Sequence, residues 1–271
     1  MKGAEGKKGK EMSFSFFRLA DREQKPRSRG LTEIRDMGLS LRQLDDLFEM
    51  SSDYIDILKM SSGTQRLTDR EIVRKKIRKC HDNGIEVSTG GFLERVLLQG
   101  GHAVDRFLDE ARSLEYDVVE ISNGMAILSL ADRIRLVKRV AREGFKTKPE
   151  VAQAYGLSAG EKVEVHSSGF ISEIRSLLES GAWMVMIESE GLTENVSEWN
   201  TKVIRDIAAS ADTGRLMFEA ADVEVFDWYI RTFGPDINLY IDWSQVNALE
   251  MVRTGLWGKR FSWGRVASSR E

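Results

Sequence analysis

Strand-like and helix-like segments alternate eight times along this 271-residue chain, at a spacing of roughly thirty residues. Each strand-like segment is short and apolar or alternating, and each is followed by an amphipathic segment of helical period. The predicted strands cover residues 31–38, 54–60, 85–91, 116–122, 145–151, 183–189, 216–220 and 237–243. The predicted helices cover residues 41–51, 68–81, 92–114, 129–143, 168–180, 196–210, 222–233 and 244–255. Gly100 and Gly101 are expected to break the segment at 92–114.

Alternating strands and helices imply a parallel sheet, and eight such units over about 250 residues imply a closed (β/α)8 TIM barrel in a single α/β domain. Inward side chains of the central strands, such as Val118 and Met186, should then be buried. A doubly wound open sheet is the alternative topology. The glycines do not follow a first strand in dinucleotide-binding spacing, which argues against a nicotinamide site.

Composition narrows the class of protein. The net charge is -3, and no face of the chain is forced to be basic, which argues against a nucleic-acid partner. No run of about 18 apolar residues occurs, so we expect no membrane span. The single cysteine, Cys80, excludes an internal disulfide framework and suits a reducing compartment. The expected location is the cytoplasm.

The N-terminal region has its own character. Residues 1–13 are rich in glycine and lysine, and we expect a disordered tail that precedes a barrel domain over 14–271. Phe14, Phe16 and Phe17 form an apolar patch that we expect to cap the barrel bottom or to pack on a partner, which leaves a homo-oligomer open. A glycine-containing loop at 153–165 is either a lid or a surface insertion.

The strand at 145–151, FKTKPEV, carries charges where a core strand should be apolar. Alternation places Lys148 and Glu150 on one face of this strand and Thr147 and Pro149 on the other. A charged pair inside a barrel is costly unless it binds something. A purely structural ion pair at the barrel mouth is the alternative.

Active sites of such barrels lie at the C-terminal ends of the strands. Nearly every predicted strand delivers a polar or ionisable residue there, namely Asp36, Lys59, Ser88, Glu120, Ser122, Asn123, Lys148, Glu150, Glu188, Glu190, Glu219 and Asp242. Carboxylate oxygens are the ligands that Mg²⁺ prefers, and lysines neutralise phosphate or carboxylate groups. The set therefore predicts a metal together with a small anionic substrate.

Two further features bear on this site. Thr89, Gly90 and Gly91 open a predicted helix whose free N–H groups suit an anion, although a tight turn explains these glycines as well. The three histidines, His81, His102 and His166, fall away from the strand ends. That placement argues against a histidine metal site or a catalytic triad.

Several segments resemble the phosphosulfolactate synthase family, over about residues 25–265. They are KPRSRGLTEIRDMGL, YIDILKMSSGT, EVSTGGFLE, YDVVEISNG, KPEV, LMFEAAD and INLYIDWSQVNALE. The segments IESEGLTENVSEW and GLWGKRFSWGRV are more similar to the branch that includes plant heat-stress-associated relatives. The resemblance implies a (β/α)8 lyase that adds sulfite to phosphoenolpyruvate with Mg²⁺.

This resemblance implies roles for residues at the strand ends. Phosphate or carboxylate would be held by Lys25, Arg27 and Lys59, with Thr89, Gly90, Gly91 and Ser122 also binding substrate. The metal or its surroundings would be formed by Glu120, Glu150, Glu188, Glu219 and Asp242. Catalysis would fall to Lys148, Lys59 and Glu150, with Lys148 as proton donor or anion clamp.

The chain departs from the family pattern at two points. Glu150 is followed by Val151-Ala152-Gln153-Ala154, where synthases carry glycine and paired lysines. The sequence Glu188-Ser189-Glu190-Gly191 stands where synthases have Arg-Glu-Ser-Gly. Each departure removes positive charge from the expected anion site. A non-catalytic protein of heat-stress protection or interaction is therefore the rival to the lyase.

Overall fold

A computed structural model describes residues 12–124, 128–152 and 166–257 of the chain. Eight parallel strands close a barrel in sequence order, and β8 pairs back onto β1. The strands are β1 (Thr32–Asp36), β2 (Ile57–Met60), β3 (Glu86–Ser88), β4 (Val118–Ile121), β5 (Lys146–Val151), β6 (Val185–Ile187), β7 (Leu216–Glu219) and β8 (Leu239–Asp242). The (β/α)8 prediction is confirmed, and the open sheet is excluded.

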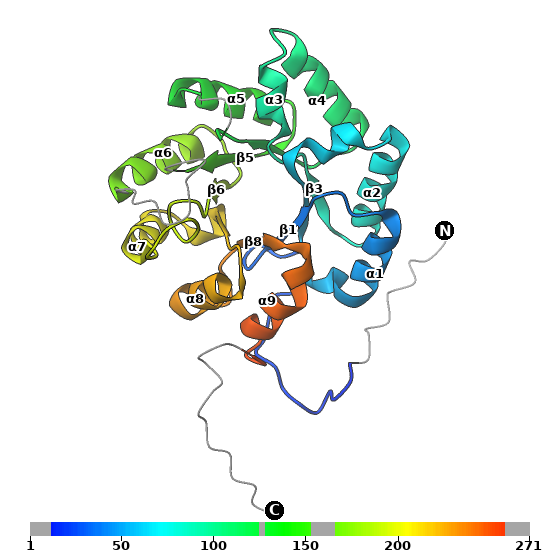
Figure 1. Cartoon of the computed structure of the whole chain (residues 1–271), viewed down its shortest axis with the longest axis vertical. Coiled ribbons are helices and arrows are strands. Elements are labelled where there is room, and N and C mark those ends of the chain that lie inside the picture. The colour runs from blue at the N-terminus through cyan, green and yellow to red at the C-terminus, as the bar shows by residue number, and fades with distance from the viewer. Residues whose placement is uncertain (1–11, 125–127, 153–165, 258–271) are drawn as a thin grey trace, which may run out of the picture.

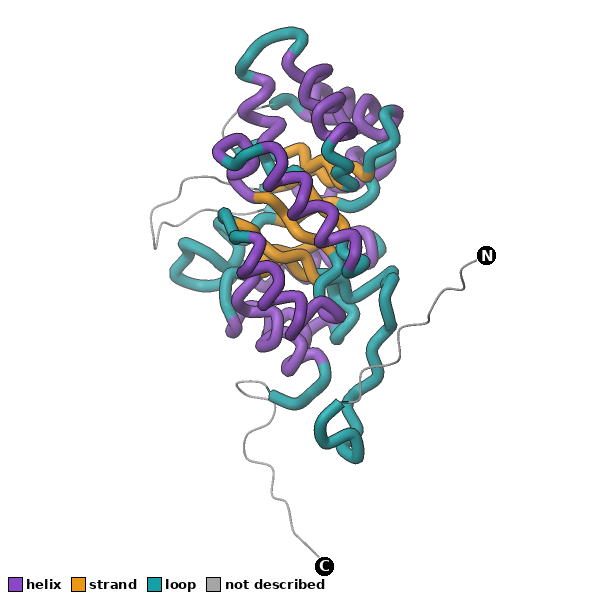
Figure 2. Tube along the Cα trace, turned by 90° about the vertical axis from the view of Figure 1, so that its right-hand side faces the viewer, coloured by secondary structure: helices purple, strands orange, loops and turns teal. Residues whose placement is uncertain are grey.

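Helices surround the barrel, as Figure 1 shows from one end and Figure 2 from the side. They are α1 (Leu41–Ser51), α2 (Arg70–Asp82), α3 (Phe92–Leu97), α4 (Ala103–Ser113), α5 (Leu130–Arg142), α6 (Ser167–Glu179), α7 (Thr201–Ser210), α8 (Val223–Phe233) and α9 (Val246–Arg253). Short 3₁₀ turns are η1 (Ser52–Tyr54), η2 (Ser61–Leu67), η3 (Thr213–Arg215) and η4 (Trp243–Gln245). In the described ranges, no helix is both long enough and apolar enough to cross a bilayer.

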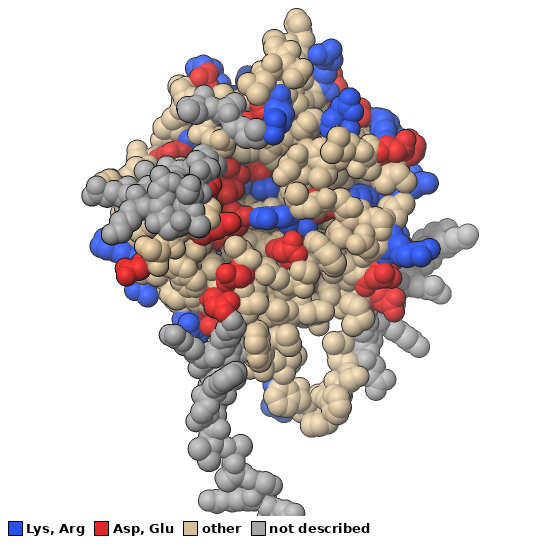
Figure 3. All heavy atoms as spheres, in the orientation of Figure 1, with Lys and Arg blue, Asp and Glu red and all other residues tan. Residues whose placement is uncertain are grey.

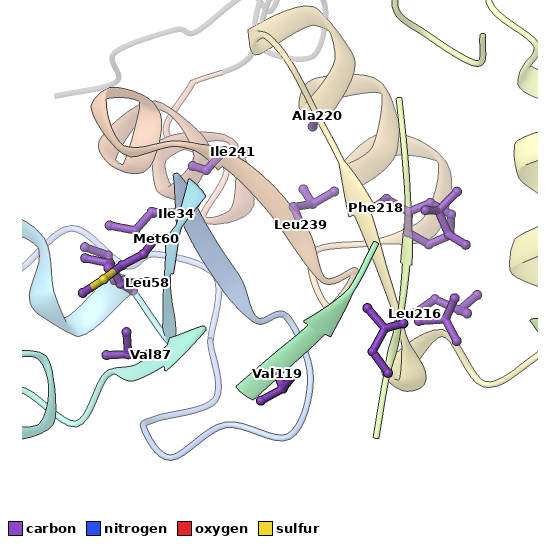
Figure 4. Packing of buried hydrophobic residues seen from close by; sticks show 14 of the residues in the cluster. Ile34, Leu58, Met60, Val87, Val119, Leu216, Phe218, Ala220, Leu239 and Ile241 are labelled. Atoms are coloured by element: carbon purple, nitrogen blue, oxygen red, sulfur yellow. The ribbon is translucent and has the colours of Figure 1, made fainter. Parts of the chain in front are cut away.

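The main hydrophobic core lies between the sheet and the helices. Outward side chains of the strands, including Ile34, Leu58 and Phe218, are fully buried there (Figure 4). A smaller cluster around Ile57, Met186 and Met217 fills the barrel interior. Met186 and Val118 have no exposed surface, which confirms the prediction made for both.

The helical segment predicted over 92–114 is divided into α3 and α4, and the break predicted at Gly100 and Gly101 is confirmed. One helix differs from its predicted bounds. The helix predicted to begin at residue 196 begins at Thr201, because the preceding loop is held in an irregular form. Asn200 donates from its backbone to the Leu192 carbonyl (2.9 Å) and from its side chain to the Gly191 carbonyl (2.7 Å).

The N-terminal aromatic patch does not cap the barrel. Phe14, Phe16 and Phe17 are 76%, 83% and 59% exposed, so the capping prediction is wrong. Met12 and Ser13, at the end of the predicted tail, are also exposed. Residues 1–11 of that tail and the loop at 153–165 lie outside the described residues.

The end of the barrel where the strands begin is closed by buried polar contacts. Asn238 has no exposed surface, and its side chain joins three strands. Its Oδ1 accepts from the Leu31 backbone N–H (2.9 Å), and its Nδ2 donates to the Leu216 carbonyl (3.0 Å). Nδ2 also lies within 3.2 Å of the Thr213 and Gly214 carbonyls. One amide therefore connects β7, β8 and β1 where the barrel closes.

Replacing Asn238 with alanine should destabilise the fold by about 2–3 kcal/mol, because it leaves buried backbone groups without partners. Urea denaturation followed by circular dichroism measures this change. Gln99→Ala, at an exposed position, is the control and should stay within about 0.5 kcal/mol of the parent. Equal stability of the two variants would contradict the closure role of Asn238.

Candidate active site

A cavity of about 370 Å³ opens at the C-terminal ends of the strands. Cations and carboxylates lie side by side in the hollow at the centre of this face (Figure 3). The described residues that line it are Arg35, Met37, Lys59, Ser61, Ser62, Gly91, Glu94, Arg95, Glu120, Ser122, Glu150, Glu188, Glu219 and Tyr240. The cavity therefore gathers most of the acids and one of the lysines predicted to meet there.

Strand alternation explains how these side chains reach the interior. In β1, Ile34 packs into the outer core, so Glu33 and Arg35 face inward. Lys59 is the inward neighbour of Arg35 in the β1–β2 register. Glu120 pairs with Lys148 in the β4–β5 register, and Glu150 follows on the same face of β5. The predicted shared face of Lys148 and Glu150 agrees with this register.

Four charged side chains form a continuous chain of ion pairs inside the barrel. The Lys59 Nζ lies 2.9 Å from Oε1 of Glu120, and the Lys148 Nζ lies 3.2 Å from Oε2 of the same carboxylate. Lys148 also pairs with Glu33. The side chains of Glu33 and Lys148 have no exposed surface, whereas Lys59 reaches the cavity wall. Lys148 thus lies beneath the cavity and is absent from its lining, so its predicted role there as proton donor or anion clamp is wrong.

These contacts shift the pKa values of Glu120 and Lys59 toward their charged forms. Burial by itself would raise the pKa of Glu120, but the charges of Lys59 and Lys148 outweigh it and hold that pKa below its ordinary value. Burial would lower the pKa of Lys59, yet Glu120 and other anionic neighbours raise it well above its usual range. Lys59 is therefore a permanent cation at neutral pH. Both oxygens of Glu120 face ammonium groups, which leaves it poorly suited to bind a metal.

The opposite wall is acidic. Burial raises the pKa of Glu150 to about 7, and Lys59 offsets only part of that effect. Burial and the carboxylates of Glu150 and Glu219 raise the pKa of Glu188 well above its ordinary value. For Glu219, burial is outweighed by a hydrogen bond with Glu188 and by the nearby cations, so its pKa is lowered. In the absence of a cation, this group of three acids retains protons near neutral pH.

Arg35 and Tyr240 connect the two walls. The Arg35 guanidinium donates to Oε1 of Glu219 (2.5 Å) and to the Tyr240 hydroxyl (2.9 Å). The Lys59 Nζ lies 4.3 Å from the centre of the Tyr240 ring, a cation–π geometry. The Ser61 and Tyr240 hydroxyls are 3.2 Å apart. These contacts hold two cations in the wall where an anion would bind.

Gly91 and Ser122 meet at another part of the wall. A Cβ at Gly91 would lie 2.3 Å from Ser122 Oγ, so only glycine fits without a shift. Ser122 is 6% exposed, and its hydroxyl has no hydrogen-bond partner among the described residues. A buried hydroxyl that lines a cavity without a partner is suited to a polar ligand.

The neighbouring Thr89 and Gly90 do not belong to the cavity lining. The Thr89 hydroxyl donates to the Gly90 carbonyl (3.2 Å) and accepts from the Glu120 backbone N–H (3.3 Å). Gly90 has a φ of +57°, and a Cβ there would lie 2.4 Å from the Met60 carbonyl oxygen. Their substrate-binding prediction is replaced by a structural role, because both residues pack β3 against β2 and β4.

Lys25 and Arg27 lie at the opposite end of the barrel, so their predicted role in holding substrate in this cavity is wrong. The Lys25 Nζ donates to the carbonyls of Ser52 (3.0 Å) and Ile55 (2.6 Å), which precede β2. Arg27 pairs with Asp56 at 3.1 Å, also before β2. Their charges fasten the segment before β1 to the barrel bottom.

Two carboxylates expected at the mouth are used elsewhere. Asp242 accepts from the Ser244 backbone N–H (3.0 Å) and hydroxyl (2.6 Å) and begins the turn η4, so it does not line the cavity as a metal ligand. Asp36 points away from the barrel axis. It pairs with Lys76 at 2.6 Å and accepts from the Leu39 backbone N–H.

The sequence analysis missed Glu33, Arg35 and Tyr240. The signal was present in TEIRD, where an apolar Ile34 on the buried outer face requires that its neighbours point inward. Tyr240 alternates in the same way between the outward Leu239 and Ile241. Arg95, which lines the cavity from α3, has no strand alternation to reveal it.

The acidic wall has the chemistry of a Mg²⁺ site, since buried carboxylates supply hard oxygen donors. Within residues 12–124, 128–152 and 166–257, however, no three His, Cys, Asp or Glu side chains already converge on one point as a metal site. Mg²⁺ is commonly held by one or two carboxylates with water and substrate phosphate, so a ready-made cage is not required. Glu188 and Glu219 fit that description.

Comparisons with solved structures support the fold. The chain is similar to 3-hexulose-6-phosphate synthase from Salmonella typhimurium, with a TM-score of 0.56 and 10% identity over 82% of this chain and 98% of that one. It is also similar to 3-keto-L-gulonate-6-phosphate decarboxylase from Vibrio cholerae, with a TM-score of 0.55 and 10% identity over 84% and 99% of the two chains. At this identity the likeness establishes the barrel alone.

Sequence comparisons go further. The chain is 30% identical to the protein HEAT-STRESS-ASSOCIATED 32 of Arabidopsis thaliana, over 90% of this chain and 93% of the relative. It is 32% identical to the phosphosulfolactate synthase of Methanocaldococcus jannaschii, over 86% and 94% of the two proteins. The family model for (2R)-phospho-3-sulfolactate synthase, ComA, matches residues 20–259. The resemblance in the sequence segments is thus confirmed, and the chain belongs to the (2R)-phospho-3-sulfolactate synthase family.

Proposed function

We propose that this chain is a phosphosulfolactate synthase-like lyase that adds a nucleophile, sulfite in the first instance, to phosphoenolpyruvate in the presence of Mg²⁺. The observation that carries the proposal is the two-sided cavity. One wall presents Lys59, Arg35 and the Ser122 hydroxyl, and the other presents Glu150, Glu188 and Glu219. An anion suits the first wall, and a divalent cation suits the second.

The charge balance of the cavity supports a metal. Among the described residues, its lining contains five carboxylates and three cations. The carboxylates are Glu94, Glu120, Glu150, Glu188 and Glu219, and the cations are Arg35, Lys59 and Arg95. Such a cavity repels a small anion unless a cation or protons offset the excess. With all five carboxylates ionised, the excess is two negative charges, which a divalent ion or protons would offset.

Glu188 and Glu219 are the proposed metal-holding residues, because they are adjacent and share a proton without it. When bound there, Mg²⁺ would neutralise the oxygens of the anionic substrate and the charge that develops on its carboxylate side. Arg35 keeps the Glu219 carboxylate in place through its 2.5 Å contact.

The addition also requires a proton donor and groups that hold the anion, and side chains of the cavity can supply both. The sulfur lone pair of sulfite forms a bond to the terminal carbon of the enol phosphate, and the electron pair of the double bond moves to the neighbouring carbon. That carbon then takes one proton, and no group leaves. Glu150 is the proposed proton donor, since it lines the cavity near Lys59 and burial raises the pKa of its carboxyl in the metal-free protein. Lys59 and Ser122 would hold the anion.

One prediction of the proposed function concerns the dependence of substrate binding on Mg²⁺. Isothermal titration should show phosphoenolpyruvate binding that weakens at least about tenfold when Mg²⁺ is removed, because the anion then loses its attraction to the divalent charge. Glu188→Gln should weaken Mg²⁺-dependent binding by a similar factor. Glu190→Gln, two residues along and outside the cavity lining, is the matched control. If neither Mg²⁺ nor phosphoenolpyruvate gives a detectable heat of binding, the result would favour the non-catalytic protective protein instead.

The second prediction concerns the close contact of Gly91 and Ser122. Gly91→Ala should displace the Ser122 hydroxyl and weaken phosphoenolpyruvate binding roughly two- to tenfold, the worth of one hydrogen bond. Gly91→Ala/Ser122→Gly should recover stability but not affinity. Gly101→Ala, with no atom near the added Cβ, should match the parent in both. Unchanged affinity in the first variant would remove Ser122 from the proposed anion site.

The third prediction concerns pH. The pKa of Glu150 rises from 4.5 to about 7 on folding, so the folded state binds this proton more tightly between those values. Its contribution to stability is complete below about pH 4.5 and is lost as the pH rises through about 7, by at most about 3 kcal/mol. In metal-free urea denaturation, Glu150→Gln should therefore gain stability relative to the parent between pH 5 and pH 8. A parallel pH dependence of the two proteins would contradict the shift.

A further inference from the structure

The ion pair of Glu33 and Lys148 crosses the interior of the barrel. Glu33 projects from β1 and Lys148 from β5, which are opposite strands of the eight. Both side chains are fully buried, and neither lines the cavity. At the level of Glu33, the neighbouring strand β2 supplies the apolar Ile57. Apolar side chains thus fill part of the same interior. Apolar residues could therefore also fill the space that Glu33 and Lys148 occupy.

The pair is joined to the cavity through one carboxylate. Lys148 contacts Oε2 of Glu120 at 3.2 Å, while the other oxygen of Glu120 contacts Lys59 at 2.9 Å. Of the two lysines in these ion pairs, Lys59 lines the cavity and Lys148 does not. The position of Lys59 therefore depends on a carboxylate that Lys148 holds from below.

We propose that Glu33 and Lys148 are positioning residues, which set the Glu120 carboxylate and through it the Lys59 ammonium that faces the ligand. Neither one touches the ligand. Glu33 balances Lys148, so that Lys148 does not draw Glu120 fully away from Lys59. Lys148 in turn holds one oxygen of the Glu120 carboxylate, which leaves the other oxygen directed at Lys59.

An alternative is that the pair only stabilises the fold. A buried ion pair can often be replaced by apolar residues of similar volume without loss of stability, whereas removal of one partner is costly. The double variant Glu33→Leu/Lys148→Met removes both charges together and should fold. The protein offers a matched control in Glu86 and Lys146, a second Glu and Lys pair (2.6 Å) at the other end of the barrel. Lys146 lies two residues before Lys148 in the same strand.

The first measurement needs no ligand. Lys59 should react slowly with acetic anhydride, because its contact with Glu120 at 2.9 Å keeps it a cation. In Glu33→Gln, Lys148 should pair more fully with Glu120, and the acetylation of Lys59 at fixed pH, followed by mass spectrometry, should accelerate at least about tenfold. Glu86→Gln should leave the rate at the parent value. A folded Glu33→Gln protein with the parent rate at Lys59 would overturn the proposal.

The second measurement rests on the proposed function and uses phosphoenolpyruvate with Mg²⁺. Glu33→Leu/Lys148→Met should keep its urea midpoint yet bind phosphoenolpyruvate at least about tenfold more weakly. The control Glu86→Gln/Lys146→Met should bind like the parent. Parent affinity in the first double variant would overturn the positioning role. If the parent protein does not bind phosphoenolpyruvate, that result counts against the proposed function only. The acetylation rate of Lys59 in Glu33→Gln then tests the positioning role by itself.

Discussion

The site depends on the requirement that charges inside a closed barrel find partners there. Removing a carboxylate or ammonium from water costs several kcal/mol, and only close opposite charges offset this. The barrel meets the requirement with alternating contacts from Glu33 to Lys148, Glu120 and Lys59. The chain of contacts begins at a fully buried acid and ends at a cation on the cavity wall. Its geometry therefore ties the packing of the interior to the site above it.

The same constraint explains why the two walls differ. On the side of β1, β2 and β4, each acid is close to a cation, and the pKa of Glu120 is lowered. On the side of β5 and β6, Glu150 and Glu188 have mainly other acids as near neighbours, and their pKa values are raised. Arg35, from β1, returns one positive charge next to Glu219.

Membership in the synthase family and similarity to a plant heat-stress protein point to different biological roles for one barrel. The proposed lyase gives a use to two features of the cavity, namely the Ser122 hydroxyl, which has no partner in the part of the chain that the structure describes, and the hydrogen-bonded acids Glu188 and Glu219. Functional sites often keep charges that the fold would do better without. The acidic wall has that character, since burial disfavours its ionised forms.

The sequence by itself determined the barrel, the order of its strands and the face on which Lys148 and Glu150 lie. These features follow from a local period of two in each strand and from the alternation of strands with helices. The same period, applied to Ile34 and Leu239, would also have placed Glu33, Arg35 and Tyr240 inside. Only the tertiary structure decided which inward charges pair, because Glu33 and Lys148 are 115 residues apart and meet only when the barrel closes. It also decided the end of the barrel at which Lys25 and Arg27 lie, since loop charges carry no period that fixes their direction.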